Sequence, residues 1–154
     1  MSVEARFAEL KLELPPAPKP AGIYAPVLIV GEMAYVSGHG PIRTDGTLIV
    51  GKVGEALSET EGFDAARAVG LTMLATLKRE LGSLDRIVRI VKTLGMVNAI
   101  PDFKHHPQVI NGFSNLWVEL LGEQNGRGAR SAVGMGSLPS NIPVEVEAQF
   151  LIRP

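Results

Sequence analysis

The final strand predicted from the sequence reads PVEVEAQFLI over residues 143–152. Apolar side chains alternate there with acidic and amide side chains, a period of two that is typical of a strand with one buried face. The apolar set is Val144, Val146, Ala148, Phe150 and Ile152. The other face carries Glu145, Glu147 and Gln149. Polar groups in mid-sheet need partners or a polar cavity, so we expect this face to meet a subunit interface or a site.

The rest of the chain predicts an α+β fold with one mixed sheet. Ser58 and Glu61 have the spacing of a capping box, and apolar residues then recur every three or four positions until Gly82. A second helix is predicted from Pro107 to Gly122. Further strands are predicted over residues 27–30, 33–37, 47–50, 87–97 and 130–135. The predicted order is β-β-β-α-β-α-β-β, with both helices on one face of the sheet.

A shorter helical pattern precedes this unit. Apolar residues at helical spacing predict a helix over residues 3–14, and the proline-rich stretch 15–20 reads as an extended connector. We therefore expect residues 1–20 to be an N-terminal extension and residues 21–154 to form a single domain.

Composition excludes several classes of function. The 154 residues include no cysteine, which removes disulfides, thiolate nucleophiles and cysteine-ligated metals. The formal net charge of −1 gives no electrostatic footprint for nucleic acid. The N-terminus lacks the apolar core of a secretory signal, and no apolar run approaches the ~20 residues of a membrane span. We expect a cytoplasmic protein that binds neither nucleic acid nor membrane.

The sharpest candidate for chemistry is the pair Arg130 and Glu145, fifteen residues apart on two predicted strands. If these strands are neighbours, the guanidinium and the carboxylate can lie near one another at one sheet surface. An arginine can hold a substrate carboxylate with two parallel hydrogen bonds, and a nearby carboxylate can position or activate water. A purely structural ion pair fits the same spacing.

Several motifs resemble the YjgF/RidA superfamily of reactive-imine deaminases, also described as endoribonuclease L-PSP-like. Tyr24 stands thirteen residues before Ser37-Gly38, and Asn111 lies in the second predicted helix, as in that family. The C-terminal signature is matched by Arg130-Ser131, Leu138-Pro139 and Val144-Glu145-Val146-Glu147-Ala148.

This resemblance implies a chorismate mutase-like homotrimer, of the bacillus type, with clefts between subunits. It implies that Arg130 anchors the carboxylate of a small 2-imino or enamine acid, helped by backbone groups of Ala132, and that Glu145 orients the attacking water. The products would be a 2-keto acid and ammonia, with no metal and no organic cofactor. Tyr24, Ser37, Gly38 and Asn111 would line the cleft.

Two local features leave alternatives open. His39 follows Ser37-Gly38 where family members usually carry glutamine, so we expect it at the mouth of the predicted cleft among the substrate-binding residues. Either a hydrogen-bonding or an acid–base role fits it. Asp102, His105 and His106 are possible metal ligands, but a loop before Pro107 is more often solvated.

Three functions remain compatible with the sequence. The first is hydrolytic deamination of imino acids. The second is binding of a small carboxylate metabolite without turnover. The third, ribonuclease activity, is the weakest because no basic channel is evident.

Overall fold

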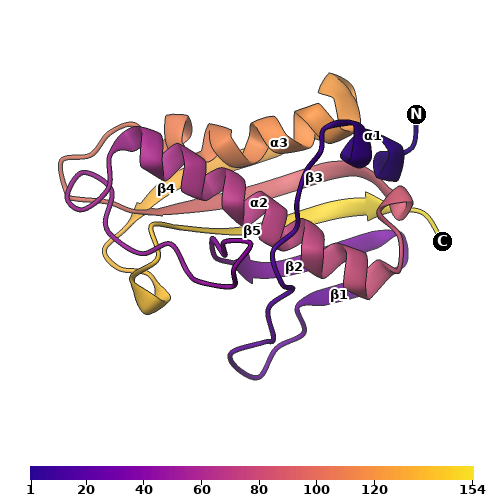
Figure 1. Ribbon diagram of the computed structural model, residues 1–154, viewed down its shortest axis with the longest axis horizontal. Coiled ribbons are helices and arrows are strands. Elements are labelled where there is room, and N and C mark those ends of the chain that lie inside the picture. Colours follow the sequence, from indigo (N-terminus) through magenta and orange to yellow (C-terminus); the bar gives the residue numbers. More distant parts are fainter.

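The computed structural model describes residues 1–154, and its centre is one five-stranded sheet (Figure 1). The strands are β1 (Val27–Val30), β2 (Met33–His39), β3 (Ile87–Asn98), β4 (Ala129–Met135) and β5 (Val144–Ile152). Their spatial order is β1-β2-β5-β3-β4, and only the pair β3 and β4 is parallel. The predicted mixed α+β sheet is therefore confirmed. The strand β5 lies at its middle, and β4 is an edge strand.

Two long helices pack side by side on one face of the sheet (Figure 1). They are α2 (Glu59–Leu81) and α3 (His106–Gly126). The predicted start of α2 is confirmed, because the Ser58 side chain accepts from Glu61 N and the Glu61 side chain accepts from Ser58 N. Its predicted end is confirmed too, since Gly82 adopts a left-handed conformation with φ 79°.

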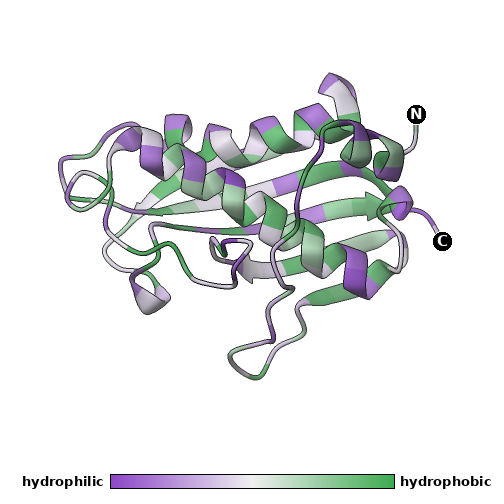
Figure 2. Ribbon diagram, viewed as in Figure 1, coloured by the Kyte–Doolittle hydropathy of each residue, from purple (hydrophilic) through white to green (hydrophobic).

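The core lies between these helices and the sheet. Its largest fully buried side chains include Phe113 and Trp117 of α3, Met73 of α2 and Phe150 of β5. In Figure 2 hydrophilic and hydrophobic segments alternate along both helices, as expected of helices with one buried side. No helix combines the length and the apolar character that crossing a membrane would require.

The prediction of a strand over residues 47–50 is wrong. This segment makes only one isolated bridge, between Ile42 and Leu48. The turn lies just before this segment, at residues 44–46, where the Asp45 carboxylate accepts from both Thr47 N and Thr47 Oγ1. The segment then folds back on residues 41–43, with Arg43 N donating to Thr47 O at 2.8 Å and Ile49 N donating to Pro41 O at 3.0 Å, and it does not join the sheet. The observed order after the N-terminal helix is consequently β-β-α-β-α-β-β.

Two predicted helix ends also need correction. The N-terminal helix α1 spans Val3–Glu9 rather than residues 3–14, because Leu10 ends it and Lys11 turns left-handed with φ 52°. In α3, Gly122 is non-helical (φ 78°, ψ 166°), yet one more turn follows and extends the element to Gly126. The predicted stop at Gly122 is thus a break inside the element.

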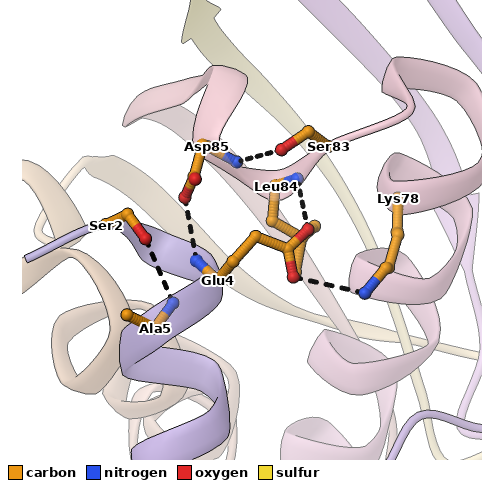
Figure 3. Close-up of polar contacts among 7 residues, drawn as sticks. All are labelled: Ser2, Glu4, Ala5, Lys78, Ser83, Leu84 and Asp85. Carbon is orange, nitrogen blue, oxygen red and sulfur yellow. Dashed lines mark hydrogen bonds and ion pairs between the residues drawn. The ribbon is translucent and has the colours of Figure 1, made fainter.

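A polar network fixes α1 to the rest of the chain (Figure 3). Glu4 N donates to Asp85 Oδ1 (2.9 Å), and Leu84 N donates back to Glu4 Oε1 (3.0 Å). Glu4 Oε2 pairs with Lys78 Nζ of α2 at 3.2 Å. From this anchor the proline-rich connector passes across α2 to the sheet edge at β1, as Figure 1 shows.

Candidate functional site

The predicted site residues other than Ala132 separate into two cavities of the single chain. The larger, here called the Glu145 cavity, has a volume of about 570 Å³. Its lining includes Tyr24, Ser37, Gly38, His39 and Glu145. The smaller, here called the Arg130 cavity, has a volume of about 390 Å³, and its lining includes Asn111 and Arg130.

The condition under which Arg130 and Glu145 would share one sheet surface of a single chain, that their strands are neighbours, is not met. The strand β3 lies between β4 and β5, with Thr93 paired to Arg130 and Met96 paired to Glu145. The two side chains also point to opposite faces of the sheet. Arg130 contacts α3, whereas Glu145 alternates with the buried Val144 and so faces away from the helices. One chain alone cannot bring these two groups to one ligand.

The Glu145 carboxylate lies directly against Gly38 of β2. A Cβ atom built on Gly38 would be 3.0 Å from Glu145 Cδ and closer still to Oε1. Burial raises the pKa of Glu145 above its ordinary value, and the like charge of Glu147 raises it further. A carboxyl group whose pKa is moved toward neutrality is suited to exchanging protons with a bound water.

The remaining groups of the Glu145 cavity hold its walls in place. Ser37 Oγ donates to Ala25 O at 2.7 Å, so the hydroxyl is engaged with the backbone and no base activates it. Tyr24 is 47% exposed, and its hydroxyl accepts from Ala21 N at 3.2 Å. The connector residues Pro18–Gly22 form one wall, and Arg79 of α2 fastens them by donating to Pro18 O at 3.0 Å.

The Arg130 guanidinium is half-buried on the helix side of β4. Its Nη1 donates to Ser114 Oγ (3.0 Å) and its Nη2 donates to Pro107 O (3.2 Å). Burial lowers the pKa of Arg130, but an arginine side chain stays protonated in proteins. The guanidinium has five N–H groups, and these two hydrogen bonds leave the others able to donate to a ligand. Ala132 lies on the same side of β4, two residues along the strand, and is half-buried.

Ser114 is a site residue that the sequence reasoning missed. It fixes the orientation of Arg130, and it lies three residues after Asn111 on α3, so both line the same cavity. The spacing of three residues on a predicted helix places Ser114 on the same helix face as Asn111, and this pattern could have identified it as a site residue.

The histidines near residue 105 do not converge with other metal-binding side chains. His105 Nδ1 lies 2.7 Å from Glu59 Oε2, and the His106 ring packs edge-on against Phe103 with 5.1 Å between ring centroids. No group of three histidine or acidic side chains in the chain is arranged to hold a metal ion.

Together these features define a class of protein: a five-stranded α+β sheet with two helices on one face, an acidic cavity against its middle strands and an arginine at its edge. Comparison with known proteins agrees. Residues 4–146 match the family described as "YjgF/chorismate_mutase-like, putative endoribonuclease". The chain belongs to this YjgF/RidA superfamily.

Similar proteins span nearly the whole chain. The Protein TCP17 of Trypanosoma cruzi is 40% identical over 146 residues, which cover 95% of this chain and 91% of that protein. The structure of Atu1372, a protein of unknown function from Agrobacterium tumefaciens, is 39% identical with a TM-score of 0.86, covering 98% and 92% of the two chains. A structure from Shewanella oneidensis, described as a "putative endoribonuclease", is 31% identical with a TM-score of 0.92, covering 99% and 100%.

Proposed function

We propose that this protein is a homotrimer that hydrolyses small reactive 2-imino or enamine acids in clefts between its subunits. In this proposal Arg130 of one subunit meets the Glu145 cavity of the next. The observation that carries the proposal is the separation of the two groups on one chain. Each borders a cavity and each keeps unused polar atoms, but only a second subunit can place them around the same ligand.

The exposed face of the sheet supports a subunit contact. The side opposite the helices carries the exposed apolar side chains Leu28, Val30 and Tyr35, which lie together on β1 and β2, and Val30 is 58% exposed. At the other edge of the same face, β4 carries the exposed Val133. Exposed apolar groups gathered on one surface are typical of interaction sites. The strand β4, which carries Arg130 on its helix side, is the edge strand that borders this face (Figure 1).

The chemistry follows from the two side chains. The guanidinium of Arg130 binds the substrate carboxylate through its free N–H groups. The Glu145 carboxylate accepts a proton from water while the water oxygen attacks C2 of the iminium, which yields a carbinolamine. Glu145 gives that proton to the nitrogen, and as the C–N bond breaks it accepts the proton of the carbinolamine hydroxyl and passes it to the departing ammonia. A 2-keto acid and ammonium leave, and Glu145 is ionised again. The overall balance is one iminium plus one water for one keto group plus one ammonium ion.

The substrate carboxylate provides specificity in this scheme, and Glu145 provides the rate. A raised pKa makes Glu145 a stronger base once it is ionised and a usable acid when it is protonated. Activity should therefore rise with pH through the raised pKa of Glu145.

The direct test is to generate 2-imino acids with an amino-acid oxidase and to follow keto-acid formation against semicarbazone trapping. Wild-type protein should accelerate keto-acid formation. Glu145→Gln should bind 2-oxobutanoate but lose turnover, whereas Arg130→Ala should lose binding in calorimetry. Glu32→Gln and Arg153→Ala change equivalent charges at exposed positions outside both cavities and serve as controls. Binding without any turnover would instead favour a carboxylate-binding protein of the same fold.

A further inference from the structure

The strand β2 changes register beside Glu145. It pairs regularly with β5 as far as Val36 and Ala148, and pairing resumes at His39 and Val146. Two residues of β2, Ser37 and Gly38, therefore face one residue of β5, which is the geometry of a β-bulge. The extra residue turns the next side chain to the other face of the sheet.

Because of this bulge, His39 points into the helix layer. Only 5% of the residue is exposed, and its Nε2 lies 2.8 Å from Thr76 Oγ1 of α2. Its Nδ1 lies 2.6 Å from the Ser37 carbonyl oxygen. The same bulge places Gly38 on the opposite face, where the Glu145 carboxylate rests against it.

The two hydrogen bonds determine the form of the imidazole. A carbonyl oxygen can only accept, so Nδ1 carries the hydrogen and donates it to Ser37 O. Nε2 of the neutral ring then accepts from the Thr76 hydroxyl. Burial lowers the pKa of His39, the bond to Ser37 opposes this, and the positive charge of Arg79 lowers it again. Both ring nitrogens are thus engaged with protein groups, and neither is free for a substrate proton.

We propose that His39 is a positioning residue: its neutral ring links the Ser37–Gly38 bulge to Thr76 of α2 by hydrogen bonds. This link fixes the backbone of Gly38, against which the Glu145 carboxylate lies. The opposite side of the bulge is held as well, since Ser37 N donates to Pro26 O at 3.0 Å. This inference rests on the proposed function, because it gives Glu145 its place in the reaction. It assigns His39 a role through Glu145 rather than through the substrate.

Four variants separate positioning from a general loss of stability. His39→Leu and Thr76→Val remove hydrogen bonds while filling the same space, and each should lower kcat about 10- to 100-fold with KM changed less than about threefold. His39→Gln keeps a donor and an acceptor, Thr76→Ser keeps the hydroxyl, and both should stay within about threefold of the wild type. Equal kcat for wild type and His39→Leu would overturn the proposal, as would equal loss in His39→Leu and His39→Gln.

A second measurement does not depend on turnover. In ¹⁵N NMR of the free wild-type protein at pH 7, His39 should be neutral with the hydrogen on Nδ1. The ¹³C titration midpoint of the Glu145 carboxyl should fall toward the ordinary value in His39→Leu and return in His39→Gln. A hydrogen on Nε2, or an unchanged midpoint, would contradict the role of His39 even if the deaminase proposal failed for other reasons.

Discussion

Replacing Gly38 by alanine should lower the activity of this protein strongly and its stability only slightly. A Cβ at this position would lie 3.0 Å from Glu145 Cδ and 3.2 Å from Cγ, and closer still to Oε1. Unstrained carbon contacts need roughly 3.5–4.0 Å, so the carboxylate must retreat by about 1 Å. Gly38 has no positive φ, so alanine can adopt its backbone conformation.

The loss of stability and the loss of activity should differ in size, because the atoms that the added Cβ would meet lie at the end of the flexible Glu145 side chain. Unfolding free energy should fall by less than about 1 kcal/mol, since Glu145 can rotate away. A displacement of about 1 Å at the reacting group should lower kcat by up to about 10²-fold.

The assay compares urea unfolding with imino-acid hydrolysis for wild type and Gly38→Ala. Gly136→Ala is the matched control, because no atom beyond its two chain neighbours lies within 4 Å of its added Cβ. An unchanged kcat would refute the reasoning. So would a loss of more than about 2 kcal/mol of stability in Gly38→Ala, because the clash would then involve more than a mobile carboxylate.

Three further substitutions test other parts of the structure. Gly112→Ala should destabilise the fold by about 1–3 kcal/mol in urea unfolding, because its Cβ would meet the backbone carbonyl of Phe63 in α2 and force the helices apart; a change below about 0.5 kcal/mol would contradict that contact. Glu145→Gln should raise the melting temperature at pH 7. The raised pKa means that the Glu145 carboxyl binds its proton more tightly in the folded state, so its ionisation lowers stability as pH rises through that pKa. The gain should disappear at a pH below the ordinary glutamate pKa, and an equal gain at that pH and at pH 7 would be inconsistent with this origin. Glu4→Ala should lower the unfolding free energy by about 1 kcal/mol, because it removes the two side-chain contacts that anchor α1. The control Glu13→Ala, at an exposed position, should change it little. Equal effects of the two substitutions would show that the anchor contributes no stability.

Elements with strong local signals could be predicted from the sequence. The alternation in 143–152 predicts β5 because a period of two places every apolar side chain on one face of an extended strand and on no single face of a helix. The Ser58 capping box and Gly82 predict both ends of α2, since each satisfies backbone groups at a helix terminus by a short-range contact. These features depend on residues a few positions apart.

Features that depend on tertiary structure could not be predicted in this way. Nothing local shows that β3 inserts between the strands of Arg130 and Glu145, because strand order is decided by packing over the whole sheet. The bulge that buries His39 is likewise invisible, since a shift of one residue reverses the face of every later side chain. Residue type and spacing therefore point to Arg130 and Glu145, and the family resemblance adds Tyr24, Ser37, Gly38 and Asn111. The contacts that these side chains make with the rest of the chain could not be predicted.

The most direct test of the central claim uses mixed subunits. Arg130→Ala and Glu145→Gln, each inactive alone, are unfolded together in equal amounts, refolded, and assayed for imino-acid hydrolysis. If each cleft takes its arginine from one subunit and its glutamate from the next, random assembly rebuilds about a quarter of the clefts and restores about a quarter of wild-type activity. If activity stays at the level of the separate variants while wild-type protein carried through the same refolding recovers, the shared cleft is wrong.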